Sequence, residues 1–387
     1  MLVTGASGFI GSRLVERLVL EAHAQVRVLV RERVAAAPLA RLPIEVAVGD
    51  VLRPDTLAAA TADCAVVFNC VKGKSRLPKE RRAVEVEGTR NVLEAAGRSR
   101  VSRAVHLSSV MVYDLPAEGV VDETSPRIRT RDPYASAKLA SERIALELGA
   151  RGEPGVSVIQ PTVVYGPHAG VYGRDVIEEL QTSRVPLING GSGASNAVYI
   201  DDVVTALLLA ATSDRARGEA FLIAGPEPVT WREFFDAFER MLGVEHTFSV
   251  SLEDAVASAR RERGRPWLLG ELLRLFREKP DLRRRVFGTR EGALALNMAH
   301  RLLPVSFWYR SDPWFVPPPT AAAEELPVGG IRPFVARFLA SRARVDSAKA
   351  RRLLGYEPVF GFAAGMHLTE AWARWAGLLE RDSEQIS

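Results

Sequence analysis

Short apolar runs alternate with amphipathic stretches through the first half of the chain. Continuous apolar runs are typical of strands buried on both faces of a parallel sheet, and their alternation with helices indicates βαβ units. The pattern therefore predicts an α/β fold with a doubly wound parallel sheet. The predicted strands are residues 2–4, 26–30, 44–48, 65–69, 104–108 and 156–160, and the predicted helices include 10–21, 88–97 and 134–148.

The pattern changes after residue 166, where glycine, proline and short segments replace the alternation. A strand end then runs into a helix at 199–212, and the rest of the chain is mostly helical. The change predicts two domains. They are a sheet domain of residues 1–165 plus about 197–225, and a smaller, mainly helical domain of residues 166–196 plus 226–387.

The helical part contains a basic insertion at about 250–340. Between Arg260 and Arg290 there are 11 basic and 4 acidic residues around the apolar sequence WLLGELLRLF at 267–276. A basic helix with an aromatic and leucine-rich face predicts peripheral contact with an anionic membrane through about 260–290. Two other interpretations stay open: a helix that packs on the helical domain or on a partner, and a segment that covers a ligand site.

Composition excludes several classes of protein. The net charge of +4 over 387 residues gives no concentrated basic face, which argues against nucleic-acid binding. The two cysteines, Cys64 and Cys70, provide neither a disulfide framework nor metal-ligand spacing, so we expect no metal and a reducing, cytoplasmic location. The longest apolar stretch, 203–211, is too short to span a bilayer. No signal peptide precedes the first strand, but that strand is short, which leaves open a native start upstream of Met1.

A glycine-rich turn follows the first predicted strand. The sequence TGASGFIG, residues 4–11, spaces its glycines three apart between a strand and a helix. Glycine permits the tight turn, and the free N–H groups at the helix N-terminus favour an anion such as the pyrophosphate of a dinucleotide. A glycine turn without a ligand is the alternative. The predicted dinucleotide-binding residues are Gly5, Ser7, Gly8, Phe9, Ile10 and Gly11.

Residues at the ends of the next two strands indicate which dinucleotide binds. At the position that recognises the adenosine ribose, the chain has Arg31 followed by Glu32. A guanidinium suits a 2′-phosphate, so NADP(H) is favoured, and NAD(H) with Glu32 as the ribose contact is the alternative. Asp50, followed by Val51, ends the third strand. We expect Asp50 either to accept a hydrogen bond from the adenine amino group or to cap a helix, and Val51 is a further predicted cofactor contact.

Three side chains beyond the fifth strand form a candidate catalytic set. Ser109, next to Ser108, follows that strand at its carboxyl end, which faces the ligand crevice of a doubly wound sheet. Tyr134 and Lys138, in the sequence YASAK, lie four apart on one helix face. A free phenol, with a pKa of about 10, is a poor base, and a neighbouring ammonium lowers that pKa. The set predicts proton transfer at a hydroxyl in step with hydride transfer. A surface Tyr and Lys with capping serines are the alternative.

These motifs, with others in the same order, resemble the extended short-chain dehydrogenases/reductases. That group belongs with the NAD-dependent epimerases/dehydratases and includes nucleotide-sugar epimerases, dihydroflavonol reductases and 3β-hydroxysteroid dehydrogenases. The resemblance implies a Rossmann domain for the first part of the chain. The motifs that carry it are TGASGFIG, VEGTRNVLEAA (86–96), HLSSVMVY (106–113), YASAK (134–138), QPTVVYGP (160–167), NAVYIDDV (196–203) and AKARRLLGYEP (348–358).

The resemblance also implies residue roles. Tyr134 would be the catalytic acid and base, Lys138 would activate it and bind the cofactor ribose, and Ser109 would hold the substrate oxygen. A homodimer would form through the helices predicted near 88–97 and 134–148. Beyond the glycine turn, the implied cofactor contacts are Asn69, Tyr134, Lys138, Pro161 and Val163.

The chain departs from the family pattern at several places. Glu85 stands where the family often has asparagine, and residues 69–72, NCVK, stand where it often has His-x-Ala-Ala. Val110 and Met111 follow Ser109 in place of the Asp-Glu of 4,6-dehydratases, which argues against dehydration. Residues 160–162, QPT, resemble the reductase and hydroxysteroid-type members more than the sugar-nucleotide members.

Three hypotheses of function follow. The first is an NAD(P)(H)-dependent oxidoreductase that interconverts a secondary alcohol and a ketone on an apolar, sterol-like small molecule. The second is a nucleotide-sugar epimerase with tightly bound NAD. The third is a catalytically silent NADP-binding regulator, against which the intact Ser109, Tyr134 and Lys138 argue.

Overall fold

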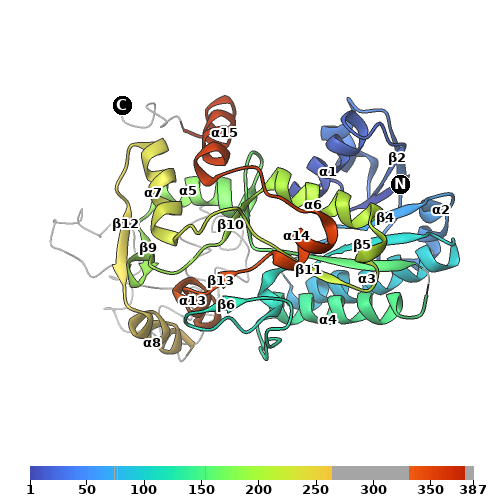
Figure 1. The fold of residues 1–387 in the computed structure, drawn as a ribbon. Helices are drawn as coiled ribbons and strands as arrows, with labels where there is room; N and C mark the ends of the chain where they lie inside the picture. The colour runs from blue at the N-terminus through green and yellow to red at the C-terminus, as the bar shows by residue number, and fades with distance from the viewer. Residues whose placement is uncertain (74, 76, 153, 264–330, 380–387) are drawn as a thin grey trace, which may run out of the picture. The chain divides into compact units, whose positions relative to one another are not determined.

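Seven parallel strands form the central sheet of the computed structural model, which describes residues 1–73, 75, 77–152, 154–263 and 331–379. The spatial order is β11-β7-β5-β4-β1-β2-β3, so the chain reverses its direction of travel across the sheet between β1 and β4 (Figure 1). Ligands of doubly wound sheets bind at the carboxyl ends of the strands beside this reversal. The strands are β1 (Leu2–Thr4), β2 (Val26–Val30), β3 (Ile44–Val48), β4 (Val66–Asn69), β5 (Arg103–Leu107), β7 (Gly155–Pro161) and β11 (Ala220–Ile223).

The predicted fold class is confirmed. Strands β1, β2 and β3 have the predicted bounds, and β4 begins one residue later than predicted. Strand β5 begins and ends one residue earlier than predicted, and β7 extends one residue further at each end. The apolar pattern did not single out β11, which pairs with β7 and ends the sheet. Its four residues, AFLI, are too few to distinguish a buried strand from a buried helix segment by periodicity.

Helices cover both faces of the sheet, as Figure 1 shows. Helices α1 (Phe9–Leu20) and α6 (Ile200–Thr212) pack together on one face, and α3 (Pro78–Arg98) and α4 (Pro133–Gly149) pack together on the other. Successive residues of a strand face the two cores alternately: Val3 lies in the core beneath α1 and α6, and Leu2 lies in the core beneath α3 and α4. Burial on both faces explains why the strands are continuously apolar. The homodimer through helices of the second pair stays a prediction.

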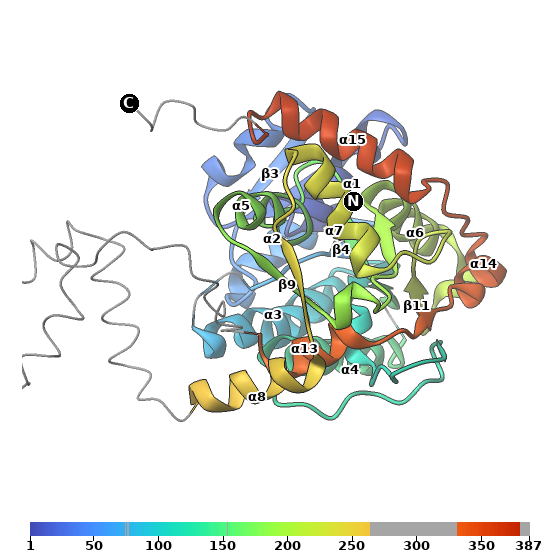
Figure 2. The ribbon, with the colours of Figure 1, turned by 90° about the vertical axis from the view of Figure 1, so that its left-hand side faces the viewer.

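Shorter strands and helices make up the rest of the described structure. Three two-stranded parallel pairs form: β8 (Val163–Tyr165) with β10 (Ala197–Tyr199), β9 (Val185–Ile188) with β12 (Thr247–Val250), and β6 (Val120–Val121) with β13 (Arg344–Val345). In Figure 2, α5, β9 and α7 lie toward the viewer, in front of the large sheet. The remaining helices are α2 (Leu57–Thr61), α5 (Asp175–Thr182), α7 (Trp231–Leu242), α8 (Leu252–Arg263), α13 (Pro333–Ala340), α14 (Ala348–Leu354) and α15 (Phe362–Trp375).

The chain divides into two compact units. Residues 1–250 with 337–387 form one, which contains the seven-stranded sheet, and residues 251–336 form the other, which contains α8. The predicted boundary between a sheet domain and a helical domain stays a prediction. The apolar sequence at 267–276 and most of the basic insertion lie outside the described residues.

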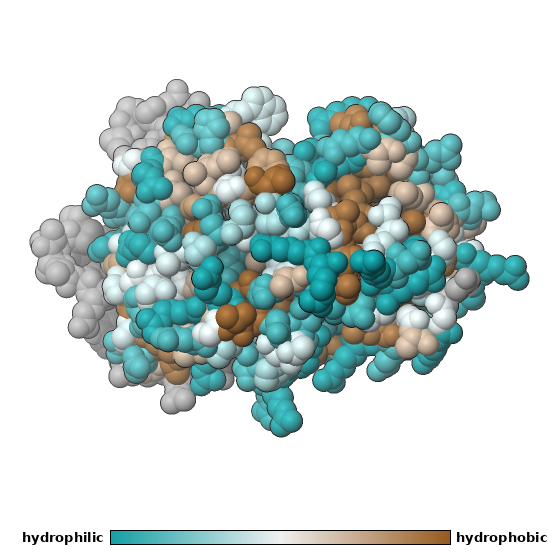
Figure 3. Space-filling view, in the orientation of Figure 1, coloured by the Kyte–Doolittle hydropathy of each residue, from teal (hydrophilic) through white to brown (hydrophobic). Residues whose placement is uncertain are grey.

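The visible surface is mixed in character. On the face shown in Figure 3, hydrophilic residues dominate, and the hydrophobic residues gather mainly around α6. Within the described part of the chain, none of the helices is both long and apolar enough to cross a bilayer.

Candidate active site

The glycine turn joins β1 to α1 at the carboxyl edge of the sheet. Gly5 has a φ of +69°, and a side chain on it would collide with the backbone carbonyl of Cys70 after β4. A side chain on Gly11 would collide with the backbone of Gly5. These two positions therefore require glycine because turn, helix and neighbouring strand approach each other closely.

Gly8 has a different reason to be glycine. A side chain there would meet only the carbonyl oxygen of Gly5 within 4 Å, at 3.1 Å, so the space beside it is otherwise open. Gly8 is the N-cap of α1, whose first turn has no acidic residue and no side-chain cap among the described contacts. Ser7 is exposed, and Phe9 and Ile10 are half-buried. An open space before an uncapped helix N-terminus fits the pyrophosphate of a dinucleotide.

The predicted ribose and adenine contacts lie on the strands next to β1. Arg31 and Glu32 follow β2 directly, and both are exposed. The Asp50 carboxylate accepts the backbone N–H of Leu52 at 2.9 Å, which forms a local turn and leaves the helix-cap alternative without support. Val51 is buried beside Gly88, where a side chain would lie 2.8 Å from a Val51 methyl group.

Asn69 ends β4 with its side chain turned into the protein. It accepts a hydrogen bond from the Thr4 hydroxyl at 2.8 Å and donates one to the Thr89 hydroxyl at 3.1 Å. Its amide also lies 3.2 Å from the His106 ring nitrogen Nδ1. Burial, together with Lys138, lowers the pKa of His106 to about 3, so this imidazole is neutral. The amide of Asn69 links β1, β4, α3 and β5, and its predicted cofactor contact stays a prediction.

Tyr134 lies in the first turn of α4, where the local sequence specifies a helix start. The Asp132 carboxylate accepts the backbone N–H groups of Tyr134 at 2.9 Å and Ala135 at 3.1 Å. Pro133 occupies the first helical position. A backbone N–H at that position has no partner within a helix, so proline, which lacks the group, is well suited to it. Tyr134 is half-buried, and the ammonium of Lys72 lies 5.4 Å from the centre of its ring.

Lys138 joins α4 to the carboxyl end of β5. Its ammonium is buried and donates to the backbone carbonyl of Leu107, the last residue of β5, at 3.0 Å. Ser109 follows two residues later, is 7% exposed and accepts the backbone N–H of Met111 at 3.3 Å. The turn η3 (Val110–Val112) that Ser109 begins packs against α4. The structure thus places Ser109 and Lys138 at the same strand end, with Tyr134 one turn away on α4.

Glu85 of α3 is the second partner of Lys138. Their side chains are each 4% exposed, and Lys138 Nζ lies 2.9 Å from Glu85 Oε2. Burial alone would lower the pKa of Lys138, but Glu85 and Tyr134 raise it, and the net pKa lies above the usual lysine value. Lys138 is therefore a permanent cation. The departure from asparagine at Glu85 was visible in the sequence, but nothing there identified its partner.

A second buried polar network lies beside Ser109, and the sequence did not reveal it. Ser108 donates to Glu142 Oε2 at 2.5 Å, and the Gln160 amide donates to both oxygens of Glu142 at 3.0 and 2.9 Å. Arg127 balances the carboxylate at 3.1 Å and lies 4.1 Å from the centre of the Tyr113 ring. These contacts hold β5, β7 and α4 together, so Ser108 is a structural serine and Ser109 remains the candidate for the substrate.

The last predicted cofactor residues lie where β7 ends. Pro161 is its final, buried residue, and Val163 is 1% exposed in β8, opposite Ala197 of β10. Thr162 between them donates to the backbone carbonyls of Asn196 and Ile223. This segment is fixed by the strands on either side, and its predicted contact with the nicotinamide stays a prediction.

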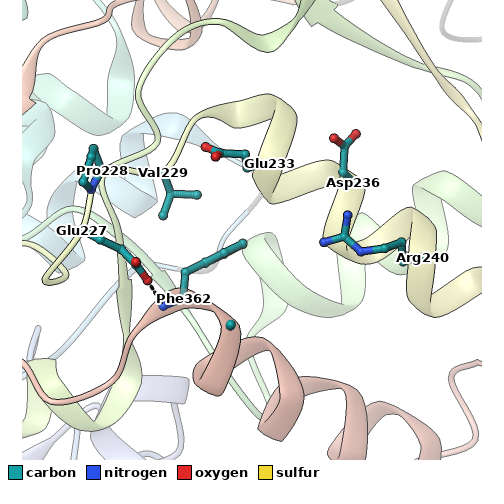
Figure 4. A pocket seen from close by; sticks show the side chains of 8 residues that line it. Glu227, Pro228, Val229, Glu233, Asp236, Arg240 and Phe362 are labelled. Carbon is teal, nitrogen blue, oxygen red and sulfur yellow. Dashed lines mark hydrogen bonds between the residues drawn. The ribbon is translucent and has the colours of Figure 1, made fainter.

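An open pocket of about 290 Å³ lies away from these residues, between α7 and the start of α15 (Figure 4). Its carboxylates already have structural partners: Glu227 accepts the backbone N–H of Phe362 at 2.5 Å, and Glu233 caps α7 through Thr230. None of the predicted site residues lines it. Within the described ranges, no group of three or more His, Cys, Asp or Glu side chains is arranged to hold a metal ion.

Both the sequence and the fold resemble those of known proteins. The sequence model described as "NAD dependent epimerase/dehydratase family" matches residues 1–224. A "4-hydroxy-2-methyl-3-oxo-4-farnesyl-3,4-dihydroquinoline-1-oxide ketoreductase" of Stigmatella aurantiaca is 29% identical over 250 residues, which are 63% of this chain and 73% of that protein. A "3-beta-hydroxysteroid dehydrogenase" of Mycolicibacterium neoaurum is 29% identical over 253 residues, 60% of this chain and 68% of that protein. The crystal structure of gox2253 superposes with a TM-score of 0.69 at 25% identity and covers 98% of this chain and 99% of its own.

Proposed function

Because this chain belongs to the NAD dependent epimerase/dehydratase family, we propose that it is an NADP(H)-dependent reductase that interconverts a ketone and a secondary alcohol on an apolar small molecule. The enzyme is of the extended short-chain dehydrogenase/reductase type and uses an NAD(P) cofactor. The observation that carries the proposal is the buried Lys138 ammonium at the end of β5, one helical turn from Tyr134. Ser109, Tyr134 and Lys138 are the proposed catalytic residues.

The chemistry divides between the cofactor and the protein. When bound, the cofactor supplies the hydride for the carbonyl carbon of the ketone. Tyr134 donates its phenolic proton to the carbonyl oxygen, so that ketone, hydride and proton together give the alcohol and leave a phenolate. Ser109 donates a hydrogen bond that orients the same oxygen. In the reverse direction the Tyr134 phenolate takes the hydroxyl proton as hydride leaves the alcohol carbon.

The residues that would hold the cofactor fit a dinucleotide. The open space at Gly8 and the uncapped N-terminus of α1 accept the pyrophosphate. Arg31 is exposed at the carboxyl end of β2, where a guanidinium can bind a 2′-phosphate in bidentate fashion. The preference for NADP(H) over NAD(H) is part of the proposal and rests on Arg31.

An aromatic cluster that includes Tyr172 supports an apolar substrate. Burial and the neighbouring Tyr134 phenol raise the pKa of Tyr172, so the two phenols lie within electrostatic range of each other. The Tyr172 ring packs against Trp231 at 5.9 Å and Phe234 at 6.2 Å between ring centres. Tyr172 thus belongs to an aromatic cluster, which suits a flat or polycyclic apolar molecule. The names of the two relatives, a ketoreductase acting on a farnesylated quinoline oxide and a hydroxysteroid dehydrogenase, describe substrates of this character.

The test is NADPH consumption with a panel of apolar ketones, including steroid ketones. Tyr134→Phe should lower the rate ~10²–10⁴-fold, because general acid–base catalysis contributes that much. Arg31→Ala should abolish the preference for NADPH over NADH in binding titrations. Arg151→Ala is the matched control, because Arg151 is exposed beyond the end of α4, at the opposite edge of the sheet. An unchanged rate in Tyr134→Phe, or bound NAD(H) that turns over sugar nucleotides without net consumption, would overturn the proposal.

A further inference from the structure

Two of the chain's departures from its family pattern meet around Tyr134. The first is Lys72, in the segment after β4, whose ammonium lies 5.4 Å from the centre of the Tyr134 ring. Lys72 is exposed, whereas Lys138, the other cation near Tyr134, is buried. A cation at this distance from an aromatic ring is attracted to it, and more strongly once the phenol has lost its proton.

The second departure is Glu85. Its Oε2 atom lies 2.9 Å from Lys138 Nζ in a pair that is almost fully buried. Its other oxygen accepts the backbone N–H of Gly73 at 3.3 Å. Gly73 follows Lys72 directly, and a side chain on Gly73 would lie 2.7 Å from the backbone of Arg81 in α3. Glu85 therefore both neutralises Lys138 and holds the segment that carries Lys72 close against α3.

Among the other described groups that interact with Tyr134 or Lys138, Asp132 is a carboxylate that accepts the backbone N–H groups of Tyr134 and Ala135. Three more groups, Cys70, His106 and Tyr172, are neutral at pH 7. Burial raises the pKa of the Cys70 thiol to about 12, against the opposing influence of Lys138. Burial and Lys138 lower the pKa of His106 to about 3, and burial raises the pKa of Tyr172 above the usual phenol value. Among the described residues, the cations near Tyr134 are Lys72 and Lys138. The carboxylates are Glu85, which pairs with Lys138, and Asp132, which accepts the N–H groups at the start of α4.

We propose that Lys72, Glu85 and Lys138 form a charge set in which Glu85 takes up the charge of Lys138, and Lys72 supplies the net positive charge that stabilises the Tyr134 phenolate. Lys72 and Glu85 are then positioning residues, because they act through Tyr134 and not on the substrate. The three charges of the set sum to one positive charge, although Lys138 is paired. The inference deepens the proposed reductase function and rests on it for its catalytic meaning.

The charges of opposite sign predict effects of opposite sign. Without the Lys72 ammonium, the phenolate loses a favourable interaction and forms at higher pH. Without the Glu85 charge, the field of Lys138 acts unopposed and the phenolate forms at lower pH. Each shift should amount to about half to one pH unit, since Lys72 is in contact with water and its interaction is weakened accordingly. A purely structural role would not predict shifts in opposite directions.

The experiment is a titration of phenolate absorbance on the full-length protein, recorded as the difference from Tyr134→Phe. It requires no substrate. The subtraction isolates the Tyr134 phenol. Burial raises the pKa of the other described tyrosines above the usual phenol value, so they ionise at higher pH; these are Tyr113, Tyr165, Tyr172, Tyr199 and Tyr356. The variants are Lys72→Met, Glu85→Gln and the double variant, with Lys72→Arg as the matched control that keeps the charge. Glu85→Asn replaces Glu85→Gln if the latter does not fold.

Lys72→Met should raise the midpoint, Glu85→Gln should lower it, Lys72→Arg should leave it in place, and the double variant should return it close to that of the parent. A midpoint unaffected by Lys72→Met, or shifts of the same sign in both single variants, would overturn the charge set. A different result would overturn the proposed reductase function, namely retained ketone reduction in Tyr134→Phe. The titrations do not measure ketone reduction. The two failures are therefore distinguishable.

Discussion

Replacing Lys138 by methionine removes the positive half of the buried ion pair with Glu85 and keeps most of the side chain's volume. The variant loses an ion pair of 2.9 Å and a hydrogen bond of 3.0 Å to Leu107. The Glu85 carboxylate is then left with the backbone N–H of Gly73 at 3.3 Å. Breaking one half of a buried pair costs about 3–5 kcal/mol of unfolding free energy, because the other charge remains in a medium of low polarity.

The assay is denaturant unfolding of the parent and of Lys138→Met at several pH values. The loss should be largest near neutral pH and should shrink in acid, where the unpaired carboxylate can take up a proton. The double variant Lys138→Met with Glu85→Gln should recover much of the loss, because no buried charge is left unpaired.

Arg53→Met is the matched control. Arg53 pairs with Asp55 at 2.8 Å, but the two side chains are 67% and 64% exposed, so its removal should cost less than about 1 kcal/mol. Equal losses in Arg53→Met and Lys138→Met, or a loss in Lys138→Met that does not depend on pH, would refute the buried pair.

Two further predictions concern the glycine turn and acid stability. In denaturant unfolding, Gly11→Ala should lower the unfolding free energy by about 1–3 kcal/mol or more, because its side chain collides with the Gly5 backbone. The unfolding free energy of Gly8→Ala should stay within ~0.5 kcal/mol of the parent, but this variant should lose dinucleotide affinity in an NADPH titration. Retained affinity in Gly8→Ala would contradict a phosphate at this turn. His106, whose pKa burial lowers to about 3, takes up a proton in the unfolded chain before it does so in the folded one, so stability should fall as the pH drops from about 6.5 toward 3. His106→Gln should flatten that fall by up to ~1.4 kcal/mol per pH unit, and identical pH dependences would show that the imidazole is accessible to protons.

The sequence predicted those parts of the candidate site that depend on neighbours along the chain. The glycine turn requires a strand before it and a helix after it, and both are local. Tyr134 and Lys138 share a helix face because residues four apart do so in any α-helix. The sequence also predicted the helix that carries them, from residue 134, and the structure starts it at Pro133 with Asp132 as the local cap. These features were recoverable because each depends on backbone geometry within a few residues.

Side chains whose partners lie on other elements were not recoverable in this way. The Asn69 amide hydrogen-bonds Thr4 of β1 and Thr89 of α3, while its predicted cofactor contact stays a prediction. Strand β11 joins the sheet by pairing with β7, which lies far from it in the sequence. The sequence could not indicate these pairings, because a short polar or apolar segment is compatible with many partners.

The sequence by itself determined the doubly wound sheet, the dinucleotide turn and the spacing of the catalytic candidates, since periodicity and turn chemistry act over short distances. Only the tertiary structure decided how charge is distributed around Tyr134. Glu85, Lys72 and Lys138 come from three separate elements, and their distances of 2.9 Å between Glu85 and Lys138 and 5.4 Å from Lys72 to the Tyr134 ring exist only after β4, α3 and α4 have packed. Electrostatic interaction depends on distance and burial, and folding sets both.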